Sequence, residues 1–156
     1  GGRTFDGRRY HPSPDPINAL LSFGYSFTAR EMQGVLESLG LDPYVGFYHT
    51  GSYGRASLSL DLIEPFRHTF IDALILRLFN KRVLTEGDFY RDEASGGFYL
   101  QKPSIHKFVR HYEQAADEAN RSYGDQERLN FRRVMWEVGG RLRKAMEGKA
   151  PFELDL

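Results

Sequence analysis

Three side chains suited to metal chemistry lie close together in the middle of the chain. His49 follows a short apolar stretch, and Asp61 and Glu64 come soon afterwards, at the expected start of a helix. Residues three apart on a helix share a face, so the two carboxylates are expected to point the same way. One imidazole and two carboxylates suit a hard or borderline divalent cation. The spacing therefore predicts a cation site with open positions for water, which can act as a Lewis acid and generate a nucleophile, for example in phosphodiester chemistry. Nothing in the local sequence selects the substrate.

A second interpretation of these residues stays open. Carboxylates are favoured near a helix N-terminus by the helix dipole, so Asp61 and Glu64 can be capping acids and His49 an ordinary loop histidine. His68, four residues after Glu64, is a candidate for a different site with that carboxylate. A carboxylate on an otherwise apolar helix is costly unless it is paired or metal-bound, which favours a functional role.

The composition sets the limits of the function. The chain has 156 residues, 40% of them hydrophobic, which suits one ordinary domain with a real core. Lysine plus arginine equals aspartate plus glutamate at 21 each, so a nucleic-acid partner would need a local basic patch. The absence of cysteine excludes disulfides, thiolate zinc sites and cysteine nucleophiles. There is also no P-loop, no GxSxG and no dinucleotide fingerprint.

The sequence shows no sign of a membrane segment. No stretch of 18 apolar residues occurs, and the charged N-terminus is not followed by the apolar core of a signal peptide. We therefore expect no membrane partner and a cytoplasmic location.

Helical patterns dominate the chain. Asp15-Pro16 is a strong helix start, and an apolar stripe continues from there to a stop at Gly40. A second long helix is expected over residues 59–80, with Ser59 as N-cap and an irregular first part because of Pro65. The long connection between these two helices is a typical place for function.

The second half predicts a small hairpin and two more helices. A capped turn at 85–88 precedes a two-stranded hairpin over 89–100. A third helix is expected from Pro103 to about Tyr123, and a fourth from an Asp125 cap to about Met146. The fold class is therefore all-α with one small β-hairpin insertion, divided into an arm at 1–15 and a helical domain at 16–150.

Basic residues suggest places where nucleic acid would bind. Arg8 and Arg9 beside Tyr10 can grip phosphate and stack on a base, although a solvated arm explains them equally well. Arg55, beside the loop glycines, can reach a phosphate or simply lie on the surface. The cationic residues of the last expected helix are read as a solvated face, with nucleic-acid contact as the alternative.

Three sequence strings resemble a known family. PDPINALLSFGYSF, GLDPYVGFYHTGSYGRASLSLDLIEPFRHTFID and LRLFNKR are similar to the C-terminal helical domain of the CRISPR-associated adaptation integrase. The likeness covers residues 6 to 110, and the hairpin after TEGDF also fits. The resemblance implies a metal-dependent DNA endonuclease and integrase that inserts short foreign DNA into a CRISPR array, in antiviral defence.

The resemblance also assigns residues. It places metal ligation on His49 and Glu64, with Asp61 as a neighbouring acid, and it implies Mg²⁺ or Mn²⁺ as the cation. It matches Arg67 to a family arginine and Tyr10 to a tyrosine near bound DNA. His68 departs from the family pattern, since relatives commonly carry proline there.

A further metal-binding glutamate of the family belongs to a helix upstream of GGRTF, so the chain is expected to be a fragment that is inactive alone. The expected partners are DNA, a second integrase copy in a homodimer formed by the full-length protein, and the small second-numbered Cas protein. The alternatives are a non-catalytic helical nucleic-acid-binding module and a metal-dependent hydrolase of another class.

Overall fold

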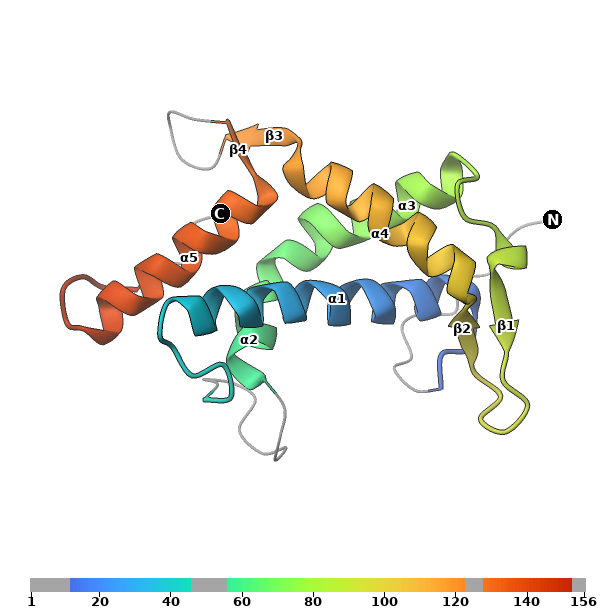
Figure 1. Ribbon diagram of the computed structural model, residues 1–156, viewed down its shortest axis with the longest axis horizontal. Helices are drawn as coiled ribbons and strands as arrows, with labels where there is room; N and C mark the ends of the chain where they lie inside the picture. Colours follow the sequence, from blue (N-terminus) through green and yellow to red (C-terminus); the bar gives the residue numbers. More distant parts are fainter. Residues whose placement is uncertain (1–11, 46–55, 123–127, 153–156) are drawn as a thin grey trace.

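The fold is a set of helices packed around one long central helix (Figure 1). The computed structural model describes residues 12–45, 56–122 and 128–152. The α-helices in these ranges are α1 (Pro16–Ser38), α2 (Ser57–Phe66), α3 (Ala73–Asn80), α4 (Lys102–Asp117) and α5 (Phe131–Met146). Two antiparallel strand pairs accompany them, β1 (Phe89–Arg91) with β2 (Phe98–Leu100) and β3 (Ala119–Ser122) with β4 (Arg128–Asn130). The predicted all-α class with a small hairpin is confirmed.

Helix α1 begins and ends where its sequence predicts. The Asn18 backbone N–H donates to the Asp15 carboxylate at 2.8 Å, and Pro16 occupies the first turn. Gly40 follows the helix with φ of 73°, a left-handed conformation that glycine adopts without steric cost. Leu20 and Leu36 are fully buried. The helix runs through the middle of the molecule and contacts α2, β2 and α5 (Figure 1).

The second helix differs from the prediction at both its start and its middle. It begins at Ser57, so Ser59 is a buried helical residue and not the N-cap. The Leu58 N–H, which has no partner within the helix, donates to the Pro43 carbonyl at 3.0 Å. This contact with the preceding connection defines the start, because Ala56 offers no side-chain cap.

Pro65 lies inside α2, and the irregularity falls after it. Residues Arg67–Asp72 form a π-helical segment before the chain resumes as α3. Proline lacks an N–H and its ring crowds the carbonyl four residues earlier, so a regular α-helical ladder cannot continue through it. The helix nevertheless persists because its apolar stripe stays buried, with Ile71 fully enclosed. A Cβ at Gly24 would lie 3.0 Å from the Ile71 side chain, so glycine allows this segment to approach α1.

The predicted capped turn and hairpin are both present. Thr85 and Asp88 form a reciprocal capping box around a short 3₁₀ turn. In the hairpin Phe89 pairs with Leu100, and both are buried on the helices. Asp88 also accepts hydrogen bonds from Ser104 Oγ at 2.7 Å and from Lys107 Nζ at 2.8 Å. The turn is therefore fastened to the start of α4.

Asp88 should make the stability of the protein pH-dependent. The hydrogen bonds from Lys107, Ser104 and Thr85 outweigh the cost of burial and lower the pKa of this carboxyl well below its usual range. Its contribution is therefore present above the unfolded pKa of about 3.9 and is lost as the pH falls toward the folded pKa.

We accordingly expect Asp88→Asn to lower the free energy of unfolding by about 1.5–3 kcal/mol at pH 7. The difference from the wild type should narrow below about pH 4. Urea unfolding of both proteins at neutral and acidic pH measures it. A difference that stays constant across this range would contradict the role of the charge.

The predicted third and fourth helices are too long. Helix α4 ends at Asp117 and not near Tyr123, because the chain turns extended at Glu118 and continues as β3. Helix α5 starts at Phe131, where the Asn130 side chain accepts from the Arg133 N–H at 2.9 Å. The second strand pair thus replaces the predicted end of one helix and the start of the next. Asp125, the predicted cap, lies outside the described residues.

One arginine of α5 is not part of a solvated face. Arg132 is 29% exposed and joins three carboxylates, at 2.9 Å to Glu31 on α1, 2.7 Å to Glu113 and 2.8 Å to Asp117 on α4. These hydrogen bonds outweigh the cost of burial and raise the pKa of its guanidinium. Tyr112 donates to Glu31 at 2.5 Å, and burial together with that negative charge raises the pKa of the tyrosine. The cluster ties α1, α4 and α5 together.

Aromatic side chains fill the centre of the domain. Phe108 on α4 meets Phe23 edge to face at 5.2 Å between ring centroids and Phe27 at 6.0 Å. Nearer α5, Phe70 stacks on Phe131 at 3.8 Å. In the described part of the chain, no helix combines the length and apolar character needed to cross a bilayer.

Candidate functional site

The described part of the candidate site is the exposed side of α2 and the π-helical segment after it. Glu64 lies near the end of α2 with its side chain 48% exposed. Its carboxylate forms an ion pair with Arg67, three residues later, whose side chain is only 15% exposed. Asp61, one turn earlier, is half-buried. The two acids thus differ in accessibility, and Glu64 is the more open to solvent.

The Arg67 side chain packs on the central helix α1. Its guanidinium lies over the Tyr25 ring of α1, 4.4 Å from the ring centroid. The Tyr25 hydroxyl donates to Asp72, which ends the π-helical segment. Tyr25 therefore joins α1 to both ends of that segment, because it contacts the first residue through its ring and the last through its hydroxyl. The ion pair to Glu64 rests on this support.

His68 does not join Glu64. Its Nδ1 lies 2.8 Å from an Asp72 carboxylate oxygen, and the imidazole is 87% exposed. The π-helical segment changes the angular spacing after Pro65, so the side-by-side arrangement of residues four apart in a regular α-helix does not apply. The alternative site that pairs His68 with Glu64 is therefore not formed.

The remaining predicted site residues lie outside the described part of the chain. They are His49, Arg55, Arg8, Arg9 and Tyr10. Within residues 12–45, 56–122 and 128–152, no three histidine or acidic side chains gather in a group able to hold a metal ion. The predicted convergence of His49 with Asp61 and Glu64 stays a prediction.

Sequence reasoning missed the two residues that support Arg67. Tyr25 and Asp72 are 47 positions apart, and nothing in either local sequence indicates that they meet. In the sequence, Tyr25 is one residue of the apolar stripe that predicts the first helix. Its ring packs in the core, but one face of the ring contacts the Arg67 guanidinium, and its hydroxyl donates to Asp72.

Solved structures share this arrangement of helices. A casposase bound to its integration product superposes with a TM-score of 0.83 at 27% identity, over 97% of this chain and 45% of the casposase chain. A Cas1 protein from Thermotoga maritima superposes with a TM-score of 0.81 at 30% identity, over 97% of this chain and 46% of the other.

Sequence similarity leads to the same family. The sequence profile described as CRISPR associated protein Cas1 matches residues 2–114. The CRISPR-associated endonuclease Cas1 3 of Thermus thermophilus is 38% identical over 148 residues, which are 95% of this chain and 44% of that protein. The chain therefore belongs to the Cas1 family. It spans less than half the length of the first curated relatives that it matches.

Proposed function

We propose that this chain is the helical catalytic domain of a metal-dependent DNA endonuclease and integrase that inserts new spacers into a CRISPR array. Membership of the Cas1 family supports the class of enzyme. The observation that supports the assignment of the site is the exposed carboxylate of Glu64, which forms an ion pair with Arg67 and which the resemblance matches to the family's acidic ligand. Its exposure leaves it accessible to a cation and to a DNA strand.

The donor chemistry at this site suits Mg²⁺ or Mn²⁺. Carboxylate oxygen and imidazole nitrogen are donors that such cations accept, and we assign them to Glu64 and His49. The resemblance implies a third ligand, a glutamate of the family, which we assign to another part of the full-length protein. When bound, the cation supplies Lewis-acid polarisation of a phosphodiester and charge stabilisation during strand transfer.

The residues of this chain then have distinct tasks. Arg67 fixes the orientation of the Glu64 carboxylate through their ion pair, and Tyr25 limits the positions open to Arg67. Asp61, on the same helix, is a neighbouring acid that shapes the local charge. Contacts to DNA are assigned to the arginines Arg8, Arg9, Arg55 and Arg67, and Tyr10 is assigned to stack on a base.

The whole protein is proposed to act in an assembly. Its partners are DNA, a second copy of the integrase and the small second-numbered Cas protein. Because net charge is zero in this chain, attraction to DNA must come from local arginine clusters, and binding should weaken as salt rises. A cytoplasmic location is part of the same proposal.

The experiment that tests this function measures joining of a DNA end to a repeat-containing target by the full-length protein with Mn²⁺. His49→Ala should abolish the divalent-dependent joining, because the imidazole ligand is removed. His106→Ala is the matched control, since His106 is an exposed histidine of α4 away from Glu64. Wild-type joining rates in His49→Ala would refute the assignment, and activity of the 156-residue chain alone would favour a hydrolase of another class.

A further inference from the structure

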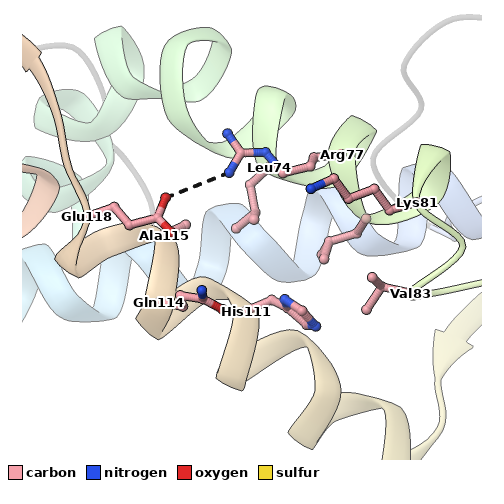
Figure 2. A pocket seen from close by; sticks show the side chains of 9 residues that line it. Leu74, Arg77, Lys81, Val83, His111, Gln114, Ala115 and Glu118 are labelled. Carbon is pink, nitrogen blue, oxygen red and sulfur yellow. Dashed lines mark ion pairs between the residues drawn. The ribbon is translucent and has the colours of Figure 1, made fainter.

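A pocket of about 280 Å³ opens between α3 and α4 (Figure 2). One wall comes from α3 and the turn after it, and the other from α4. The lining residues are Leu74, Arg77, Leu78, Lys81, Val83, His111, Gln114, Ala115 and Glu118. None of them belongs to the candidate site described above.

The pocket is built from two facing helical stripes. On α3 and its C-cap the lining positions are 74, 77, 78 and 81, and on α4 with its C-cap they are 111, 114, 115 and 118. Both sets follow the spacing of one helix face. Large side chains on such faces would normally interlock. Here Ala115 presents only a methyl group, and the half-buried Ala115 and Val83, together with the nearly enclosed Leu74 and Leu78, form an apolar floor between charged rims.

The charges around the pocket are not balanced. Arg77 reaches Glu118 only at 4.0 Å, and both side chains are about half exposed. Lys81 and His111 form no ion pair with any described residue. Two permanent cations therefore face a single carboxylate, which leaves a net positive rim. In Figure 2 the Arg77 and Lys81 side chains extend from α3, while His111 and Gln114 lie on α4 opposite them.

We propose that this pocket binds a nucleoside 5′-monophosphate, either free or as the terminal nucleotide of a DNA strand. Arg77 and Lys81 can bind the phosphate through charge-assisted hydrogen bonds. The apolar floor, through the partly exposed Ala115 and Val83, accepts the face of a planar base, and the Gln114 amide can both donate to and accept from a base edge. A volume of about 280 Å³ suits a single nucleotide and is too small for a duplex.

This site does not depend on the proposed metal chemistry. Its cations lie on α3, beyond the π-helical segment that separates α3 from Glu64 on α2. Binding can therefore be measured in the presence of EDTA, where a cation-dependent site makes no contribution. If the pocket binds no nucleotide, the proposed integrase activity can still be correct. Likewise, His49→Ala should leave nucleotide binding in the pocket unchanged, whatever its effect on DNA joining.

The test is isothermal titration of the 156-residue chain in EDTA with three small ligands and one strand. The ligands are thymidine 5′-monophosphate, thymidine and inorganic phosphate, and the strand is a 5′-phosphorylated thymidine hexanucleotide. We expect the monophosphate to bind more tightly than thymidine or phosphate alone, because it uses both the rim and the floor. The double variant Arg77→Gln, Lys81→Gln should lose about tenfold or more in affinity.

Two further variants separate a site from a general surface effect. Ala115→Leu should reduce binding without changing the charge, because the larger side chain fills the pocket. Arg110→Ala removes an exposed arginine of α4 that does not line the pocket and should leave binding unchanged. Thermal melting shows whether each variant is folded.

Comparison of the free monophosphate with the phosphorylated strand shows whether the pocket binds a free nucleotide or the end of a DNA strand. Binding of the free monophosphate that is lost in both pocket variants supports a free nucleotide. Binding of only the 5′-phosphorylated strand, with the same losses, supports a DNA end. Absence of binding for both, or binding that the Arg77 and Lys81 substitutions leave unchanged in folded protein, would overturn the inference.

Discussion

Glu64→Gln in the full-length protein is expected to slow divalent-dependent joining of DNA ends by about 100-fold or more. Loss of a residue that merely supports a metal ligand typically costs about 10–100-fold, and removal of a ligand's charge should cost no less. Glutamine has nearly the same shape and keeps an oxygen that can accept from Arg67. The substitution therefore removes the anionic ligand while it retains the local contact, and initial rates with Mn²⁺ measure the loss.

A matched control tests whether loss of a carboxylate charge affects DNA joining only at Glu64. Glu37 is an exposed acid in the last turn of α1, and Glu37→Gln makes the same chemical change. It should join DNA at the wild-type rate. If Glu64→Gln retained full activity in a folded protein, the carboxylate would not be a ligand, and the capping interpretation of Glu64 would gain support.

Phe108→Ala is expected to lower the free energy of unfolding by about 3–5 kcal/mol, the usual cost of removing a buried phenylalanine. Phe108 has no exposed surface and contacts aromatic rings of α1 on one side and Tyr112 on the other. Alanine would leave a cavity bordered by these rings, which rigid helices cannot close. Because the total stability of a domain is about 5–15 kcal/mol, this loss should be readily measured by urea unfolding.

Leu76→Ala provides the comparison for that result. Leu76 lies on α3 with 58% of its surface exposed, so the same kind of truncation removes little buried area. Its effect on the free energy of unfolding should stay within about 0.5 kcal/mol. Equal effects of the two substitutions would mean that α4 does not pack through Phe108 as described.

Local signals in the sequence were reliable wherever neighbouring residues satisfy the backbone. The start of α1 at Asp15-Pro16 and its end at Gly40 follow from capping and backbone conformation. The Thr85 turn and the hairpin after it follow for the same reason. The start of α2 did not, because the Pro43 carbonyl that accepts from Leu58 comes from a different segment.

Element ends were least predictable where a distant partner competes with helix propensity. The apolar pattern allowed α4 to continue beyond Asp117, but Ala119–Ser122 pairs with Arg128–Asn130. Similarly, the sequence predicts that Arg132 lies on the solvated face of the last helix. One of its three partners, Glu31, is 101 positions away, and no local pattern indicates that ion pair.

The sequence by itself determined the helical class, the hairpin, the main capped turns and the likeness to the Cas1 family, together with Glu64 as a candidate ligand. Those conclusions depend on residues within a few positions of one another, whose geometry the backbone fixes. Only the tertiary structure decided that Tyr25 and Asp72 support Arg67, that His68 turns away from Glu64, and that α3 and α4 enclose a cationic pocket. Each of these depends on how segments distant in the chain pack, or on the π-helical turn that this packing maintains.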